Sequence, residues 1–173
     1  EVKTMDVMAA IRGRRSVRQY QNREIKEEVL TEVLEAARLA PSANNRQEWR
    51  FVVVKDKALI ERLAEAAAGQ SFLATAPVII AGVALQPDRV MRCEVPTYAV
   101  DLAIAMTQIT LAATAQGLGS CWIGSFDQEE TKKILQIPAS CKVVQLMPLG
   151  YSAETPAARP RKPQTEVVSY DHF

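Results

Sequence analysis

The sequence is poor in the residues that build metal sites. It has one histidine, His172, and three cysteines, Cys93, Cys121 and Cys141, with no C-x-x-C spacing. Zinc and iron sites need several such ligands close together, so no metal site is expected. An odd number of separated cysteines and no recognisable signal peptide predict a reducing, cytoplasmic setting.

The motifs of several enzyme classes are also missing. The chain contains no G-x-G-x-x-G, no G-x-x-x-x-G-K-[ST] and no G-x-S-x-G. The usual signals of a Rossmann site, a P-loop and a serine hydrolase are therefore absent. His172 lies next to the end of the sequence and is interpreted as a tail residue rather than a general base. If the protein is an enzyme, a bound cofactor is expected to carry the chemistry.

Neither sign of charge is in excess. Twenty-one Lys and Arg balance 20 Asp and Glu, for a net charge of +1. This balance argues against a general nucleic-acid binder. Any function that depends on positive charge must use a local cluster of basic residues.

The length and composition predict one domain. A chain of 173 residues with 48% hydrophobic content is long enough to bury its own core, so a single domain over residues 1–173 is expected. Periodicity and capping residues predict helices over 4–12, 26–40, 57–69, 97–116 and 128–136. Strands are expected over 49–54, 77–85, 142–151 and 165–170, with a short strand in "SCWIGSF" and an extended tail over 152–164. The elements show no regular βαβ alternation, which favours an α+β fold.

Residues 97–116 form the most apolar segment and are about long enough to span a bilayer. The segment contains Asp101 and Gln108, lacks flanking basic residues, and is rich in Ala and Thr. We therefore interpret it as a helix buried in a soluble protein, apolar nearly all round. Its small side chains also make it suitable for a subunit interface.

Two basic segments lie near opposite ends of the chain. In "RGRRSVRQY" (residues 12–20), several arginines surround Ser16 just after a predicted helix end. In "AARPRKP" (residues 157–163), Arg159 and Arg161 alternate with prolines. Guanidinium groups suit phosphate oxygens, and chain ends often meet at a domain surface, so both segments could converge on one dianionic group. A solvated turn and a plain linker remain the alternatives.

The stretch "APSANNRQEWRF" (residues 40–51) places many short polar side chains between a helix and a strand. Their mixed donors and acceptors suit the edge of a heterocycle such as a pyrimidine or flavin ring. Ordinary loop chemistry, in which Ser and Asn bond to nearby backbone, is the alternative.

Four motifs, in order, resemble the FMN-dependent nitroreductase family: "RRSVRQY", "APSANNRQEWRFVVV", "GLGSCWIGSFD" and "ARPRKP". The resemblance covers about residues 8–168. It implies a nitroreductase-like α+β fold, in which helices flank a central mixed sheet, and an intertwined homodimer with FMN at the subunit interface. It also implies hydride transfer from NAD(P)H through FMN to a nitroaromatic, quinone or enone, with no role for nucleic acid or membrane.

The resemblance assigns cofactor contacts to matching positions. The FMN phosphate and ribityl chain would be bound by Arg14, Arg15, Ser16, Arg18, Arg159 and Arg161. The flavin ring would be contacted by Pro41, Ser42, Ala43 and Asn45 of the partner subunit's copy, and by Gln70, Gly124 and Ser125. No catalytic side chain is implied, because the chemistry would take place on FMN.

The chain departs from the family pattern at three places. Glu48 stands where the family usually has Pro, and Gly124-Ser125 stands where some members have Glu-Gly. Residues 86–96 are short where longer members carry extra helices, which predicts a more open pocket. A specialised flavin enzyme and a non-catalytic flavin-binding or redox-sensing protein therefore remain alternatives to a general reductase.

Overall fold

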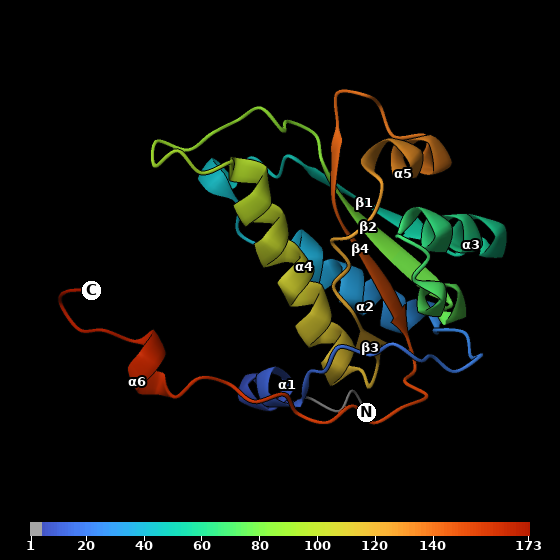
Figure 1. The fold of residues 1–173 in the computed structure, drawn as a ribbon, viewed down its shortest axis with the longest axis horizontal. Coiled ribbons are helices and arrows are strands. Elements are labelled where there is room, and N and C mark those ends of the chain that lie inside the picture. The colour runs from blue at the N-terminus through green and yellow to red at the C-terminus, as the bar shows by residue number, and fades with distance from the viewer. Residues whose placement is uncertain (1–4) are drawn as a thin grey trace.

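The computed structural model describes residues 5–173 (Figure 1). Its helices are α1 (Val7–Gly13), α2 (Glu27–Arg38), α3 (Lys57–Ala66), α4 (Thr97–Ala115), α5 (Gln128–Leu135) and α6 (Gln164–Val167). Its strands are β1 (Trp49–Val54), β2 (Val78–Ala84), β3 (Gly119–Ser120) and β4 (Lys142–Gly150). Two short 3₁₀ turns cover Ala43–Asn45 and Ser71–Thr75. Thr4, the first residue of the predicted helix 4–12, lies outside the described residues.

The strands form one sheet in the order β1-β2-β4-β3. All three neighbouring pairs are antiparallel, with a register shift between Gly82 and Val83. The resemblance implied a mixed sheet, whereas the four named strands form an antiparallel one. Parallel pairing is confined, in residues 5–173, to an isolated bridge between Ser16 and Ser120. The α+β class is confirmed.

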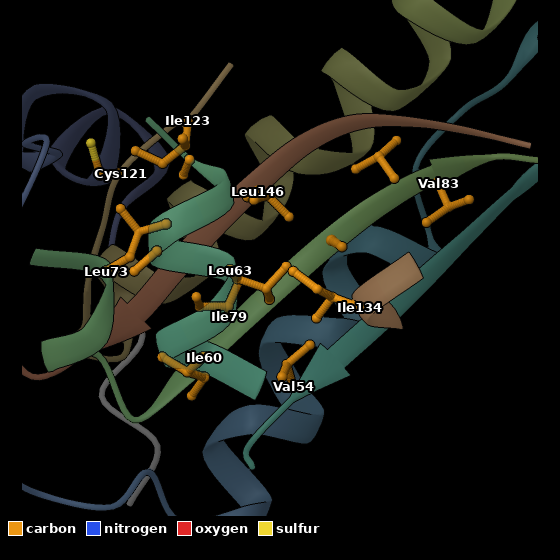
Figure 2. Close-up of a cluster of buried hydrophobic side chains, with 14 of the residues drawn as sticks. Val54, Ile60, Leu63, Leu73, Ile79, Val83, Cys121, Ile123, Ile134 and Leu146 are labelled. Atoms are coloured by element: carbon orange, nitrogen blue, oxygen red, sulfur yellow. The ribbon is translucent and has the colours of Figure 1, made fainter. Parts of the chain in front are cut away.

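The sheet lies between two helical layers. One hydrophobic cluster joins α2 and α4 to the side chains of one face, among them Ile80, Met147 and Leu149. The opposite cluster joins α3 and α5 to the other face through Leu63, Ile79 and other residues (Figure 2). Because β2 is buried at every position, it reads as a continuous apolar run instead of an alternating one.

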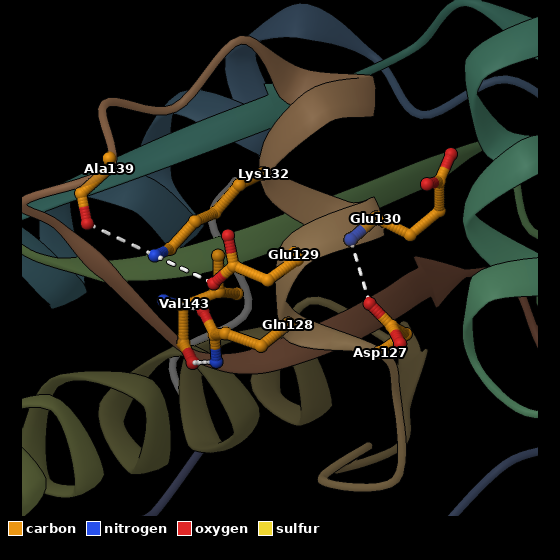
Figure 3. A network of polar contacts seen from close by, with 7 residues as sticks. All are labelled: Asp127, Gln128, Glu129, Glu130, Lys132, Ala139 and Val143. Atoms are coloured by element: carbon orange, nitrogen blue, oxygen red, sulfur yellow. Dashed lines mark hydrogen bonds and ion pairs between the residues drawn. The ribbon is translucent and has the colours of Figure 1, made fainter.

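The helix starts follow the predicted capping residues. The carboxylate of Asp56 accepts the Leu59 N–H at 2.9 Å, and that of Asp127 accepts the Glu130 N–H at 2.7 Å. Gln128 then fixes α5 to β4, since its side-chain amide exchanges two hydrogen bonds with the backbone of Val143, at 2.7 and 2.8 Å (Figure 3). A local cap and a contact with a distant strand together set the position of α5.

Helix α4 crosses the sheet and packs against α2 and α1 (Figure 1). Eight of its 19 residues are buried, among them Asp101, Leu102 and Met106. Its other side is half-buried or exposed within this chain. Within the described residues, α4 is the single helix whose length and composition would allow it to cross a membrane. A core helix of a soluble protein passes the same test.

The strand predicted over residues 165–170 is wrong. Residues 164–167 form the short helix α6, and the chain after Pro156 is exposed throughout. Its last part, with α6 and the C-terminus, projects away from the body (Figure 1). No strand within residues 5–173 pairs with this segment, so its β-forming residues are not held in an extended form.

Candidate functional site

The basic segment of residues 12–18 is held in place by the backbone. Helix α1 ends at Gly13, and the Val17 N–H donates to the Ser120 carbonyl at 3.0 Å beside the Ser16–Ser120 bridge. The Val17 side chain is buried against Gly119, where an added Cβ would lie 2.6 Å from Val17 Cγ2. The absence of a side chain at Gly119 therefore lets this segment approach β3 closely.

The segment is also bonded to the chain that follows β4. The Ala153 N–H donates to the Gln19 carbonyl at 2.8 Å, and the Arg18 N–H donates to a carboxylate oxygen of Glu154. The buried Tyr20 hydroxyl lies 2.8 Å from the Val17 carbonyl and 3.2 Å from that of Pro148. Backbone contacts on two sides thus fix the positions from which the arginine side chains project.

The two basic segments meet in a cavity of about 680 Å³. The cavity is lined by Ile11, Arg12, Arg14, Arg15, Ser16, Arg18, Pro156, Ala157, Ala158, Arg159, Pro160 and Arg161. None of its six arginines forms an ion pair with a carboxylate of residues 5–173. Such a concentration of uncompensated guanidinium groups is suited to a dianionic ligand.

The arginines are not equivalent. Arg15 directs one terminal nitrogen to the carbonyls of Arg12 and Arg14, at 2.7 and 2.9 Å, so part of its donor capacity is used within the segment. Arg161 directs a terminal nitrogen to the Arg159 and Pro160 carbonyls, both at 3.2 Å. Arg14 and Arg159 make no side-chain hydrogen bond among those of the described residues, which leaves their forks available to a ligand.

Gln70 and the loop of Gly124 and Ser125 also come together. The Gln70 amide nitrogen lies 2.8 Å from the Ala67 carbonyl and 3.2 Å from that of Ser125. Ser125 lies five positions after Ser120, which borders the basic segment, so at most about 18 Å of extended chain separates the two residues. A short connection therefore joins this loop to the strand that borders the basic segment.

The polar stretch of residues 41–45 is not part of this cavity. Its Ala43 N–H donates to the buried Asp101 carboxylate at 3.1 Å, near the start of α4. Gly13, beside the cavity, faces Thr114 in the last turn of α4. Asp101 and Thr114 are separated by about 20 Å along the helix. Within one chain, the two parts of the predicted site are therefore apart.

Part of the polar character of this stretch has a local cause. Ser42 Oγ accepts the Gln47 N–H at 3.0 Å, and Asn45 Oδ1 accepts from the Gln47 side chain at 3.1 Å. Asn44 and Asn45 both have positive φ, 53° and 54°, a conformation that Asn tolerates better than most residues. Local loop structure thus explains why Asn occurs at position 44. It also explains the Ser42 hydroxyl and the Asn45 side-chain oxygen, which accept hydrogen bonds within the loop.

Sequence reasoning missed several residues that shape the site. Tyr20 lies inside a quoted motif, but its contact with the Pro148 carbonyl spans 128 positions of the chain. Asp101 was recognised as a carboxylate in an apolar helix, but its hydrogen bond with Ala43 was not foreseen. Cys121 is buried next to the basic segment, where burial raises the pKa of its thiol and nearby Arg18 partly opposes that rise. Burial likewise raises the pKa of the Tyr20 hydroxyl, so both groups are neutral at pH 7.

The fold and the cavity define an α+β protein with a cationic cavity that is suited to an anionic ligand. The nitroreductase family model matches residues 11–151, and the chain belongs to the nitroreductase family. An NADH dehydrogenase of Thermus thermophilus is 33% identical over 195 aligned positions, which cover 95% of both chains. The FMN reductase [NAD(P)H] of Bacillus subtilis is 29% identical over 94% of this chain and 72% of its own. The solved FMN-dependent nitroreductase of Clostridium difficile superimposes with a TM-score of 0.84 at 29% identity and covers 96% of this chain and 99% of its own.

Proposed function

We propose that this protein is an FMN-dependent oxidoreductase that takes hydride from NAD(P)H and reduces a small oxidised acceptor, such as a nitroaromatic, quinone or enone. The observation that carries the proposal is the cavity lined by six arginines from both ends of the chain, none of which forms an ion pair with a carboxylate of the described residues. Family membership and the names of the relatives support the same chemistry.

The residues around the cavity fit FMN. Arg14, Arg18, Arg159 and Arg161 would hold the phosphate dianion, with Arg15 and Ser16 supplying further donors beside it. Gln70, Gly124 and Ser125, which a hydrogen bond from Gln70 to the Ser125 carbonyl brings together, would contact the ring. No group of three or more His, Cys, Asp or Glu in residues 5–173 could hold a metal ion, and the proposed chemistry needs none.

Bound FMN would supply the two-electron transfer between nicotinamide and acceptor. The chain's own residues would position it. The backbone bonds from Val17 and Gln19 fix the arginines, and the loop after β3 carries Gly124 and Ser125 to the ring. Tyr20 and Cys121 are neutral at pH 7, so neither offsets the positive charge of the cavity.

We further propose a homodimer in the cytoplasm. Residues 41–45 lie at the far end of α4 from the cavity, so Pro41, Ser42, Ala43 and Asn45 would contact the flavin of the partner subunit. The exposed residues after Pro156 and the half-buried side of α4 would supply the interface. The three unpaired cysteines suit a reducing compartment.

Arginine variants test the cofactor site. Arg14→Ala and Arg18→Ala each remove a charge-assisted contact of about 1.5–3 kcal/mol, so FMN affinity should fall about tenfold or more. The affinity is measured by the quenching of flavin fluorescence on titration with protein. Arg62→Ala, on the exposed side of α3, is the matched control and should bind FMN normally.

A wild-type protein that binds no FMN, or two variants with unchanged affinity, would refute the assignment of the cavity. Steady-state assays with NADH or NADPH and a nitroaromatic then test the reaction. A protein that binds FMN, yet is not reduced by either nucleotide, would be a flavin-binding protein and not a reductase.

A further inference from the structure

Glu48, which departs from the family pattern, forms an ion pair that was not expected from the sequence. Arg89 Nε lies 2.9 Å from Glu48 Oε2, and Arg89 Nη2 lies 3.0 Å from Glu48 Oε1. This is the two-bond geometry in which a guanidinium and a carboxylate fit best. The pair joins the residue just before β1 to the connection between β2 and α4, 41 positions along the chain.

The connection held by this pair is a small hairpin, residues 89–97. The Thr97 N–H donates to the Arg89 carbonyl at 3.0 Å, and the Met91 N–H donates to the Val95 carbonyl at 2.9 Å. Glu94 turns the tip with a φ of 66°. The hairpin exposes two apolar side chains, Val90 at 55% and Val95 at 40%. It is therefore an ordered element that presents an apolar surface to its surroundings.

The Glu48–Arg89 pair also connects this hairpin to the proposed ring-contacting stretch. Residues 42–47 are bonded to one another through Ser42 and Gln47, and Ala43 is bonded to Asp101 in the second turn of α4. The hairpin leads directly into the same end of α4 at Thr97. Glu48 thus provides a side-chain link between these two segments, in addition to their common attachment to α4.

We propose that Glu48 and Arg89 are positioning residues that hold the 89–97 hairpin beside residues 41–45, where Val90 and Val95 form one wall of the acceptor site and limit the size of acceptor admitted. This inference rests on the proposed function. It assigns a specificity role to a segment that is too short to form a helical lid. An aromatic acceptor would find an apolar surface there next to the polar groups of Ser42 and Asn45.

The first test measures the hairpin without any flavin. Cys93 is exposed at its tip, whereas Cys121 and Cys141 are buried, so a nitroxide reagent labels Cys93 in the native protein. Glu48→Gln and Arg89→Gln should each increase the mobility of this label in the electron paramagnetic resonance spectrum. Glu27→Gln breaks a different surface pair, with Lys55 at 2.6 Å, and should leave the label unchanged.

The double variant shows whether the two residues act as a pair. If they do, Glu48→Gln with Arg89→Gln gives a label no more mobile than either single variant. Additive increases, or no increase in either single variant, would overturn the positioning role.

The second test concerns acceptor size. A loosened hairpin should raise kcat/KM for nitronaphthalene relative to nitrobenzene about twofold to fivefold, the range that an exposed ion pair can supply. FMN affinity should stay at the wild-type value, because the arginine-lined cavity lies at the other end of α4. A more mobile label with an unchanged ratio of the two acceptors would overturn the specificity role. A wild-type protein that binds no FMN would instead refute the proposed function, while the label still decides whether the pair holds the hairpin.

Discussion

Tyr20 shows how one buried side chain organises the basic segment. Its hydroxyl lies within hydrogen-bond distance of the Val17 and Pro148 carbonyls, and so ties the segment to β4. The residue is only 6% exposed, and burial raises the pKa of the hydroxyl well above its usual range. The neutral phenol is therefore part of the structure that places Ser16 and Arg18.

The raised pKa of Tyr20 predicts a loss of stability in alkali. Above about pH 10 the tyrosine ionises in the unfolded chain but stays protonated in the fold, so the unfolded state gains stability as pH rises toward the folded pKa. Tyr20→Phe should cost about 1–3 kcal/mol at neutral pH because it leaves buried carbonyls without their donor. It should also remove the part of the decrease in unfolding free energy at alkaline pH that comes from the ionisation of Tyr20. Urea unfolding of both proteins at about pH 8 and about pH 11 measures the difference. Equal pH dependence in the two proteins would contradict the assignment.

Residue types could be predicted at the site, but their partners could not. The arginines of both basic segments were identifiable because clustered charge is visible in sequence. The roles of Tyr20, Asp101 and Arg89 depend on contacts with residues 41 or more positions away. Glu48 illustrates the limit: its departure from the family pattern was noticeable, yet its partner is visible only in the fold.

At the scale of elements, helices and buried strands were predicted well because their signals are local. Strand β1 has the predicted bounds, and the predicted caps Asp56 and Asp127 start α3 and α5. Residues 165–170 have strand-forming side chains, but no strand within residues 5–173 pairs with them. The strand predicted there is therefore not formed. Strand β3 is only two residues long, and its place beside the basic segment depends on Gly119.

Gly119→Ala tests the contact between β3 and the basic segment. The new Cβ would lie 2.6 Å from Val17 Cγ2 and 2.9 Å from Val17 Cβ, and a β-branched side chain cannot rotate to relieve both contacts. The substitution should lower the free energy of unfolding by about 1–3 kcal/mol and weaken FMN binding by displacing Ser16 and Arg18. Gly13→Ala is the control, since its Cβ would meet Thr114 at an ordinary 3.8 Å. Urea unfolding and FMN titration of both variants provide the measurements, and two indistinguishable variants would contradict the role of Gly119.

At the scale of the whole molecule, three features of the single chain are not explained by contacts within that chain. Residues 157–173 are all exposed, with Val167 and Tyr170 among them. One side of α4 is incompletely buried, and residues 41–45 are far from the cavity of the same chain. A second copy that receives the tail and offers its own residues 41–45 to the cavity would account for all three.

A chain that ends at Thr155 tests this assembly. It loses the exposed apolar residues of the tail together with Arg159 and Arg161, so we expect a monomer that binds FMN at least about tenfold more weakly. Full-length Arg159→Ala with Arg161→Ala separates the two effects, because it should lose FMN affinity and stay dimeric. Sedimentation velocity gives the oligomeric state, and flavin titration gives the affinity. A truncated chain that remains dimeric would show that the tail does not hold the subunits together, and the half-buried side of α4 would then have to supply the interface alone.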